Sequence, residues 1–442
     1  EGPAAKTLIV GLGATGLSCA RFLARQGVQV AVADSRSEPP GLDALNTEYP
    51  DIAVFLGPFD DRLFDSADRL VVSPGVPVAT PQIDAARQRG VPVIGDIELF
   101  VRAAQAPVVA ITGSNGKSTV TTLLGEMARA SGIRVAVGGN LGTPALDLLD
   151  DSVELYVLEL SSFQLQRTHT LPAEVAVLLN VTPDHLDWHR DEAEYRAAKY
   201  RIFDDVDAAV INRVDDEAAQ RTSHCGRVVT FGLDEPAEHD YGIREEDGQK
   251  YLARGEALLL SIRDLALYGV HNQLNALAAL AAGDLIGLER AAMLQVLIEF
   301  PGLPHRMQFV ARIGAVDYIN DSKATNVAAA VASIDSVDGM LVLIAGGDGK
   351  GGDFAGLAAA VEGKLRSAVL IGQDAEKIAR ALDTVMPVHF AENMDVAVHM
   401  AASCAESDDT VLLAPACASF DQFDNYMARG DAFIAAVEGL RI

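Results

Sequence analysis

The sequence predicts an α/β protein whose sheets are mostly parallel. Short apolar runs rich in β-branched residues alternate with glycine-containing turns and with Ala- and Leu-rich stretches that favour helices. Continuous apolar strands separated by helices are typical of parallel sheets that helices cover on both faces. The 442 residues correspond to about three domains at roughly 150 residues per domain.

Charge and composition exclude several classes of protein. The chain has 35 basic and 62 acidic residues, a net charge of −27, which argues against non-specific binding to nucleic acid or to an anionic membrane. No apolar run approaches the ~18 residues of a membrane span, and the N-terminus has no signal-peptide core. The four cysteines form no CxxC pair and indicate no disulfide framework. We therefore expect a cytoplasmic protein. A monomer is our working expectation, which composition does not test.

The apolar runs predict strands in chain order and suggest three domains. They lie at 6–10, 28–34, 106–112, 154–160, 174–180, 208–212, 340–346 and 367–372. The strand, turn and helix pattern that opens the chain starts again at Ala106, and the proline-containing segment 300–306 is typical of a linker. The predicted domains are therefore 1–95, 96–302 and 303–442. Residues 220–270 are weakly patterned and predict a peripheral β or loop region.

The first domain opens with a dinucleotide-binding pattern. GLGATG, residues 11–16, lies between a predicted strand and a predicted helix, and Asp34 ends the next strand. This pattern is typical of a Rossmann-like fold with Asp34 at the ribose. Uridine diphosphate would satisfy the glycines as well as NAD would, and tight packing of strand on helix remains an alternative.

The second domain opens with a phosphate-binding pattern. TGSNGKST, residues 112–119, follows an apolar strand and begins a helix. Backbone amides of such a P-loop bind phosphate oxygens, Lys117 can reach the β- and γ-phosphates, and Ser118 or Thr119 can bind Mg²⁺. Ile111 stands where the strict pattern has glycine, so the loop is a variant. A glycine-rich turn with a surface lysine is the alternative.

Two further side chains follow strands of the same domain. Glu159 and His185 each come just after an apolar run, where the carboxyl ends of parallel strands form a ligand crevice. A carboxylate and an imidazole beside a P-loop suit Mg²⁺, although His185 could be purely structural. Lys199 lies in a predicted amphipathic helix, and its local sequence indicates a solvated surface lysine.

The third domain contains three polar loops after predicted strands. INDSKATN (319–326) contains Asp321, Lys323 and Thr325; AGGDGKGGD (345–353) contains Lys350; PACASFDQF (415–423) ends the last apolar run. In a parallel sheet these loops could line one side of a crevice. Helix caps and turns would explain each loop equally well.

In order along essentially the whole chain, these motifs resemble those of the Mur ligase family of ATP-dependent amide-bond synthetases. SPGV, GGNLGTP, LELSSFQL, NVTPDHLD, YRAAK, HNQLNALAA and GLPHR add to the match. The D-[ND]-P-R segment that is usual in the lysine- or diaminopimelate-adding members does not occur, which favours the D-glutamate-adding branch.

The resemblance implies a fold and a reaction. The fold would comprise a Rossmann-like N-terminal domain, a central P-loop ATPase-type domain with a parallel sheet, and a Rossmann-like C-terminal domain. The enzyme would add D-glutamate to UDP-N-acetylmuramoyl-L-alanine through an acyl phosphate, using ATP and two Mg²⁺ ions. This reaction belongs to bacterial peptidoglycan precursor synthesis, on which cell shape and division depend.

The resemblance also implies roles for individual residues. The uridine substrate would contact Thr15, Asp34, Ser35, Arg36, Gly75, Asn140 and Gln164. ATP would contact Gly113, Ser114, Asn115, Gly116, Lys117, Ser118, Thr119, Asn272, Asn275, Arg306 and Asp321, with Lys323 near its phosphates. D-Glutamate would contact Thr325, Lys350, Ser419 and Tyr426. Metal ligands would be Ser118, Glu159, His185 and Lys199, the last carbamylated by CO₂. Lys117, His185, Lys199 and Lys323 would be catalytic.

Several alternatives remain at this point. Another Mur ligase or a folylpolyglutamate-synthetase-like ligase would share the ATP-binding domain. An NAD-dependent oxidoreductase would explain the first motif but not the P-loop, Glu159 or His185. A nucleotide-regulated binding module would use the P-loop as a switch without catalysis. Ala14 and Phe420 depart from the family pattern, which leaves the detail of the uridine and glutamate pockets open.

Overall fold

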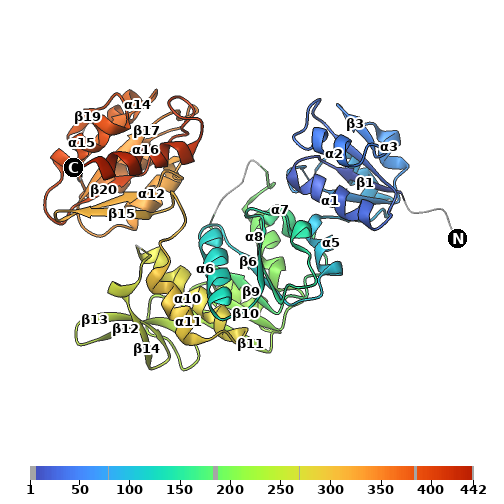
Figure 1. The fold of residues 1–442 in the computed structure, drawn as a ribbon, viewed down its shortest axis with the longest axis horizontal. Coiled ribbons are helices and arrows are strands. Elements are labelled where there is room, and N and C mark those ends of the chain that lie inside the picture. The colour runs from blue at the N-terminus through green and yellow to red at the C-terminus, as the bar shows by residue number, and fades with distance from the viewer. Residues whose placement is uncertain (1–5, 78, 183–187, 268, 383–385, 441–442) are drawn as a thin grey trace. The chain divides into compact units, whose positions relative to one another are not determined.

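The computed structural model describes residues 6–77, 79–182, 188–267, 269–382 and 386–440. The described strands form three sheets of five, nine and six strands, which Figure 1 shows with helices packed on their faces. By their internal contacts the residues divide into two compact units: Glu1–Ser261 with Asn275–Val296, and Ile262–Leu274 with Leu297–Ile442. The predicted α/β class is confirmed.

The N-terminal sheet is parallel and has the strand order β3-β2-β1-β4-β5. Its strands are β1 (Thr7–Val10), β2 (Val30–Asp34), β3 (Ala53–Leu56), β4 (Arg69–Val72) and β5 (Val93–Ile94). The helices are α1 (Ala14–Arg25), α2 (Leu42–Glu48), α3 (Asp61–Asp65), α4 (Pro81–Gln88) and α5 (Asp96–Ala103). The order changes direction beside β1, so its carboxyl end lies at the switch point where such sheets bind ligands.

The central sheet has the order β14-β13-β12-β11-β10-β9-β6-β8-β7. Strands β6 (Val108–Thr112), β7 (Val135–Gly139), β8 (Leu155–Glu159), β9 (Val175–Leu178), β10 (Ala208–Asn212) and β11 (Arg227–Phe231) are parallel. The antiparallel strands β12 (Tyr241–Glu246), β13 (Gln249–Arg254) and β14 (Ala257–Ser261) extend one edge. This extension confirms the peripheral β region predicted within 220–270.

Helices and short 3₁₀ segments connect the central strands. The helices are α6 (Lys117–Ala130), α7 (Ser162–Leu165), α8 (Glu192–Tyr200), α9 (Asp216–Arg221), α10 (Val270–Leu285) and α11 (Arg290–Glu299). The 3₁₀ segments are η1 (Ala145–Leu148), η2 (Arg201–Phe203) and η3 (Ile262–Asp264). Helix α6 begins at Lys117, within the predicted P-loop motif 112–119, as the sequence pattern requires.

The C-terminal sheet has the order β15-β16-β20-β17-β18-β19. It contains β15 (Gln308–Ile313), β16 (Val316–Asn320), β17 (Leu341–Gly346), β18 (Leu365–Ile371), β19 (Val388–Phe390) and β20 (Thr410–Leu413). Only the pairing of β15 with β16 is antiparallel among these described strands. Its helices are α12 (Val327–Asp335), α13 (Ala355–Val361), α14 (Ala375–Leu382), α15 (Met394–Cys404) and α16 (Tyr426–Gly439).

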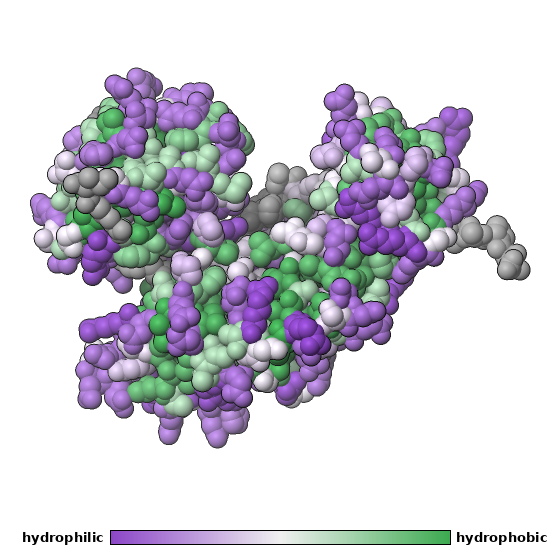
Figure 2. Space-filling model, in the orientation of Figure 1, coloured by the Kyte–Doolittle hydropathy of each residue, from purple (hydrophilic) through white to green (hydrophobic). Residues whose placement is uncertain are grey.

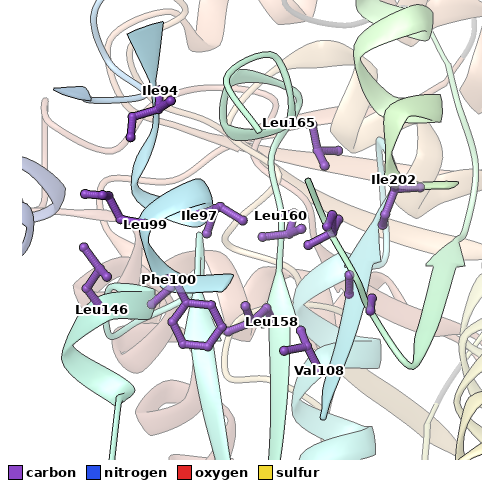
Figure 3. Packing of buried hydrophobic residues seen from close by; sticks show 14 of the residues in the cluster. Ile94, Ile97, Leu99, Phe100, Val108, Leu146, Leu158, Leu160, Leu165 and Ile202 are labelled. Carbon is purple, nitrogen blue, oxygen red and sulfur yellow. The ribbon is translucent and has the colours of Figure 1, made fainter. Parts of the chain in front are cut away.

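A hydrophobic cluster joins the end of the N-terminal block to the central sheet. Ile94 of β5 and Ile97 and Phe100 of α5 belong to the same buried cluster as Leu158 and Leu160, and Figure 3 shows these side chains gathered around α5 and the central strands. Burial of such side chains contributes roughly 1.5–3 kcal/mol each. The cluster therefore fixes α5 against the strand that carries Glu159.

No helix among the described residues is long and apolar enough to cross a bilayer.

Candidate functional site

The first motif lines a pocket in the N-terminal block. This pocket has a volume of about 520 Å³ and is bounded by the glycine loop after β1, the end of β2 and the segment after β4. Five of the seven residues predicted to contact the uridine substrate line it: Thr15, Asp34, Ser35, Arg36 and Gly75. Ala14, which departs from the family pattern, also lines it. The structure thus brings together residues that lie far apart in the sequence.

The buried carboxylate of Asp34 binds two parts of this pocket. Its side chain is 2% exposed and accepts hydrogen bonds from the backbone amide of Leu12 at 2.7 Å and from Arg36 Nη2 at 2.7 Å. Burial alone would raise the pKa of Asp34, but the bonds from Arg36 and from Leu12 outweigh it and lower the pKa to about 2. The carboxylate is therefore ionised at neutral pH and holds both the glycine loop and Arg36 in place.

The other two predicted uridine-substrate contacts, Asn140 and Gln164, do not line the pocket. Asn140 Nδ2 donates to Glu159 Oε1 at 2.6 Å. Gln164 is buried, its Nε2 donates to Asp96 Oδ2 at 2.9 Å, and its Oε1 accepts from the backbone amide of Ser161 at 3.1 Å. Contacts of these two side chains with substrate remain predictions.

The second motif forms the expected strand, loop and helix. Gly116 has φ +83°, in the left-handed region, and precedes the first residue of α6. A Cβ at this position would lie 2.3 Å from Asn275 Oδ1 of α10, so the loop needs glycine here both for its conformation and for space. Asn272 and Asn275, both predicted to contact ATP, lie on α10 and are buried.

Backbone and side-chain bonds shape the loop. The Ser114 amide donates to the Asn180 carbonyl at 2.9 Å, and the Asn115 amide donates to Asn180 Oδ1 at 2.9 Å. Ser114 Oγ lies 2.7 Å from the Tyr195 hydroxyl. Since Ser114 and Asn115 are tied to the segment after β9, the loop is preformed. Gly113, Ser118 and Thr119 complete it, and Ser118 is buried at the start of α6.

Two lysines converge on one carbonyl of the loop. Lys117 Nζ donates to the Gly113 carbonyl at 2.8 Å and to the Ser114 carbonyl at 3.0 Å. Lys199 Nζ also donates to the Gly113 carbonyl at 2.8 Å and lies 4.9 Å from the centre of the Tyr195 ring. Both nitrogens are therefore close to the position where a P-loop binds phosphate.

The local interpretation of Lys199 as a solvated surface lysine is wrong. Lys199 is 2% exposed, and Tyr195, Ala198 and Tyr200 of α8 are buried with it. The other polar residues of α8 make the helix look solvent-exposed in the sequence. The carbonyl that accepts the hydrogen bond from Lys199 belongs to Gly113, 86 residues earlier, so the local sequence does not indicate it. Burying an ammonium group is costly unless it is paired or hydrogen-bonded.

Glu159 has an oxygen that fits a bound cation. The side chain is 3% exposed at the end of β8, and its Oε2 has no hydrogen-bond partner among the described residues. A buried carboxylate oxygen is a ligand that Mg²⁺ accepts. No group of three His, Cys, Asp or Glu side chains within the described ranges forms a metal site. The predicted ligand His185 lies outside the described residues.

In the C-terminal sheet, three loops follow the adjacent strands β16, β20 and β17. The three strands are parallel neighbours, so the loops that contain Lys323, Ser419 and Lys350 leave the same edge of the sheet. This is the arrangement predicted for one wall of a crevice. The Asp348 amide donates to the Ala418 carbonyl at 3.0 Å, which links two of the loops directly.

Asp321 and Lys323 occupy the first of these loops. Burial raises the pKa of Asp321. The Asp321 carboxylate accepts hydrogen bonds from the Met307 amide at 3.3 Å and from the Ser333 hydroxyl. Burial, with a smaller contribution from Arg306, lowers the pKa of Lys323. Lys323 Nζ lies 4.2 Å from the centre of the Tyr426 ring. Lys323, predicted to lie near the ATP phosphates, and Tyr426, predicted to contact D-glutamate, are therefore neighbours.

The other predicted glutamate contacts lie around the same loops. Thr325 is partly buried, and its amide donates to the Lys323 carbonyl at 2.8 Å. Ser419 is buried. Lys350 is exposed, with φ +50° and its Nζ 5.8 Å from the centre of the Phe420 ring. Phe420, which departs from the family pattern, is 68% exposed.

Sequence reasoning missed two buried arginines, one that holds these C-terminal loops and one that holds a loop of the N-terminal pocket. Arg429 of α16 is 1% exposed and donates to the Ser322 carbonyl at 2.9 Å, the Cys417 carbonyl at 3.0 Å and the Gly346 carbonyl at 3.5 Å. Arg167 bonds similarly to the segment after β4. Arg167 lies 94 residues from Ser73, and Arg429 lies 107 residues from Ser322 and 83 from Gly346, so no local pattern marks these contacts.

Known families match successive parts of the chain. Residues 5–95 match the family described as Mur ligase MurD-like, N-terminal domain, and residues 111–283 match the Mur ligase middle domain. Residues 305–417 match the Mur ligase, glutamate ligase domain.

Curated relatives match over nearly the whole length. The chain is 53% identical over 437 residues to a protein of Pseudomonas syringae pv. syringae named UDP-N-acetylmuramoylalanine–D-glutamate ligase, covering 98% of each chain. Identically named proteins of Marinobacter nauticus and Methylobacillus flagellatus are 51% and 49% identical, over 98% and 99% of this chain and 98% and 97% of theirs.

Solved structures share the fold at lower identity. UDP-N-acetylmuramate-alanine ligase from Thermotoga maritima superposes with a TM-score of 0.58 at 19% identity, covering 98% of this chain and 99% of that one. A UDP-N-acetylmuramoyl-L-alanyl-D-glutamate–2,6-diaminopimelate ligase gives a TM-score of 0.59 at 19% identity, with 87% and 95% covered. The fold, the three domain matches and the full-length relatives together show that the chain belongs to the Mur ligase family.

Proposed function

We propose that the protein is an ATP-dependent ligase that adds D-glutamate to UDP-N-acetylmuramoyl-L-alanine in peptidoglycan precursor synthesis. The observation that carries this proposal is the P-loop between β6 and α6. Lys117 lies at the start of α6, and Glu159 lies at the end of β8, the neighbour of β6, where its Oε2 has no hydrogen-bond partner among the described residues. The full-length relatives bear the name of this activity, which selects it among the reactions that such an ATP site could perform.

The chemistry needs positioning and charge neutralisation more than a protein nucleophile. A carboxylate oxygen of the substrate's terminal alanine attacks the γ-phosphorus of ATP and releases ADP. The amine of D-glutamate then attacks the acyl carbon, loses a proton and expels inorganic phosphate, which carries the carboxylate oxygen away. Lys117, whose ammonium lies within the loop, would stabilise the transferring phosphoryl group.

Each predicted group of residues has a task in this reaction. Thr15, Asp34, Ser35, Arg36 and Gly75 would hold the uridine nucleotide in the N-terminal pocket. Asn272, Asn275, Arg306 and Asp321 would hold the adenine nucleotide, with Lys323 near its phosphates. Thr325, Lys350, Ser419 and Tyr426 would orient D-glutamate. Ser118 and Glu159 would hold Mg²⁺, which neutralises phosphate charge when it is bound.

Lys199 supports a finer proposal, that CO₂ carbamylates its amine. The reaction of the neutral amine with CO₂ forms an N–C bond, releases a proton and turns a cation into an anionic oxygen ligand. In the unmodified state Lys199 and Lys117 bring two ammonium groups to the same Gly113 carbonyl. A carbamate at Lys199 would place an anionic group near the Lys117 ammonium, which it would attract, and would supply metal ligands together with His185.

The test is phosphate release by the purified protein with ATP, Mg²⁺ and UDP-N-acetylmuramoyl-L-alanine. We expect D-glutamate to support phosphate release, and L-glutamate and L-lysine not to support it. Tetrahydrofolate in place of the uridine substrate should also give no release. Phosphate release that is the same with all the amino acids would exclude the proposed specificity. Calorimetry with NAD⁺ tests the oxidoreductase alternative, which requires that the protein bind NAD⁺. Absence of NAD⁺ binding would exclude that alternative.

A further inference from the structure

One wall of the N-terminal pocket is a loop with little regular structure. Residues 73–77, here called the wall loop, line the pocket together with the glycine loop after β1. Within it, the Val76 amide donates to the Ser73 carbonyl at 3.0 Å. Ser73 Oγ donates to the Gly11 carbonyl at 2.9 Å, which ties the two loops together at one end. The remainder of the wall loop needs other support.

Arg167 provides that support from the central block. Its Nη1 donates to the Ser73 carbonyl at 3.2 Å and to the Pro74 carbonyl at 3.5 Å, and its Nη2 donates to the Val76 carbonyl. The side chain is 2% exposed. Burial lowers the pKa of Arg167 to about 10, against the opposing effect of Asp96, so the guanidinium is charged at neutral pH. One buried cation thus binds three carbonyls of the wall loop.

These bonds determine which way a peptide group of the pocket points. In a trans peptide the C=O and the following N–H point in opposite directions. Because the Pro74 carbonyl points toward Arg167, the Gly75 N–H points away from Arg167. Gly75 lines the pocket, and nothing lies within 4 Å of the place where a Cβ would be. Gly75 is therefore accessible from the pocket, with open space where a side chain would be.

Arg167 is itself held firmly. Its backbone amide donates to the Gln164 carbonyl at 3.0 Å, and its carbonyl accepts from the Gly95 amide at 3.1 Å. Gln164 in turn donates to Asp96 at the start of α5. Arg167 follows α7, which follows the strand that ends at Glu159. The anchor of the wall loop is thus built into the segment after the predicted metal-binding strand.

We propose that Arg167 is a positioning residue for the uridine nucleotide: it holds the wall loop so that the Gly75 N–H and the loop surface face the ligand. The proposal rests on the proposed function, because the ligand is the uridine substrate. Arg167 is not among the residues that line the pocket, so it would act on the ligand only by positioning the wall loop. It therefore affects binding of this substrate rather than phosphoryl transfer.

The test compares Arg167→Met and Arg167→Lys with the control Arg201→Lys. Arg201 also donates to backbone carbonyls of this segment, at Thr168 and Gln166, but not to the wall loop. Lysine keeps the charge of Arg167 without its planar fork, so this variant remains useful if the methionine variant does not fold. For each folded variant, calorimetry without ATP gives the Kd of UDP-N-acetylmuramoyl-L-alanine, and kinetics give kcat and the three KM values.

We expect both Arg167 variants to raise the Kd and KM for the uridine substrate by ~10-fold, the scale of one lost charge-assisted hydrogen bond. The KM for ATP and for D-glutamate should stay within about twofold, and Arg201→Lys should match the wild type. Faster hydrogen exchange of residues 73–77 should accompany the weaker binding.

Three outcomes would overturn the assignment: unchanged uridine-substrate affinity in both Arg167 variants, an equal rise in all three KM values, or the same loss in Arg201→Lys. A different result would contradict the proposed function instead. If the wild type binds the uridine substrate but releases no D-glutamate-dependent phosphate, the ligase proposal fails, while the calorimetric comparison still decides the role of Arg167.

Discussion

At the level of single residues, the notable feature is the convergence of Lys117 and Lys199 on Gly113. Both ammonium nitrogens lie 2.8 Å from its carbonyl oxygen. Anions that enter this site would be attracted by both ammonium groups, because charges interact strongly in a partly buried site. ATP phosphates would supply that negative charge to Lys117. A carbamate would supply it at Lys199 and would also provide the metal with oxygen ligands.

Replacement of Lys199 by alanine tests the carbamate. We expect Lys199→Ala to lose at least ~10²-fold in kcat, the scale of one preorganised electrostatic contact. Formate or acetate should restore part of the activity, since a free carboxylate can take the place of the carbamate oxygens. The measurement is phosphate release against carboxylate concentration.

Lys117→Ala is the matched control, because it removes a lysine from the same carbonyl but no carbamate. Short carboxylates should not restore its activity. Rescue of both variants, or of neither, would contradict carbamylation at Lys199. Chloride at the same ionic strength controls for salt.

At the level of elements, α16 acts as a clamp on the predicted glutamate site. Arg429 on this helix binds the carbonyls of Ser322 in the loop after β16, of Cys417 in the loop after β20, and of Gly346, the last residue of β17, where the third loop begins. Burial lowers the pKa of Arg429 to about 10. These loops contain Thr325, Lys350 and Ser419. A single guanidinium therefore joins the loops that carry three predicted glutamate contacts.

We expect Arg429→Lys to raise the KM for D-glutamate by ~5- to 10-fold and to lower the free energy of unfolding by about 1–3 kcal/mol. Lysine cannot reproduce the planar fork, and it leaves buried carbonyls without donors. Arg380→Lys, on the exposed face of α14, is the control. Kinetics and urea unfolding provide the measurements. An unchanged KM for D-glutamate in a destabilised Arg429→Lys variant would show that the clamp supports folding alone.

Local patterns predicted much of this fold, since the information for a strand, a glycine turn and the next helix lies within a few neighbouring residues. Strand β10 occupies 208–212, the predicted range, and α6 starts at Lys117 as the P-loop pattern requires. The left-handed Gly116 illustrates how a local conformational need marks a residue in the sequence.

Long-range contacts could not be predicted in this way. Arg167 and its partner Ser73 are 94 residues apart, and Arg429 and Ser322 are 107 apart. The same limit explains why the burial of Lys199 was not predicted. Its helix looks polar, and its partner, the Gly113 carbonyl, lies in the loop after β6. The resemblance to a family, rather than spacing, singled out Lys199 as functional. Roles of the individual site residues remain predictions that the variants above test.

For the whole molecule, the net charge of −27 opposes substrates that are all anionic. Figure 2 shows hydrophilic residues over every block of the chain on the visible face. Salt screens this long-range repulsion beyond about 8–10 Å, so binding depends on local cations and on amides at helix starts. The local cations at the predicted sites are Arg36, Lys117, Arg306, Lys323 and Lys350.

The central claim is that an acyl phosphate links ATP cleavage to amide-bond formation with D-glutamate. The most direct measurement uses UDP-N-acetylmuramoyl-L-alanine labelled with ¹⁸O in its terminal carboxylate and follows the label into inorganic phosphate by mass spectrometry. We predict D-glutamate-dependent release of phosphate in which each molecule carries one carboxylate oxygen. Unlabelled phosphate, or labelled phosphate released equally without D-glutamate, would contradict the claim.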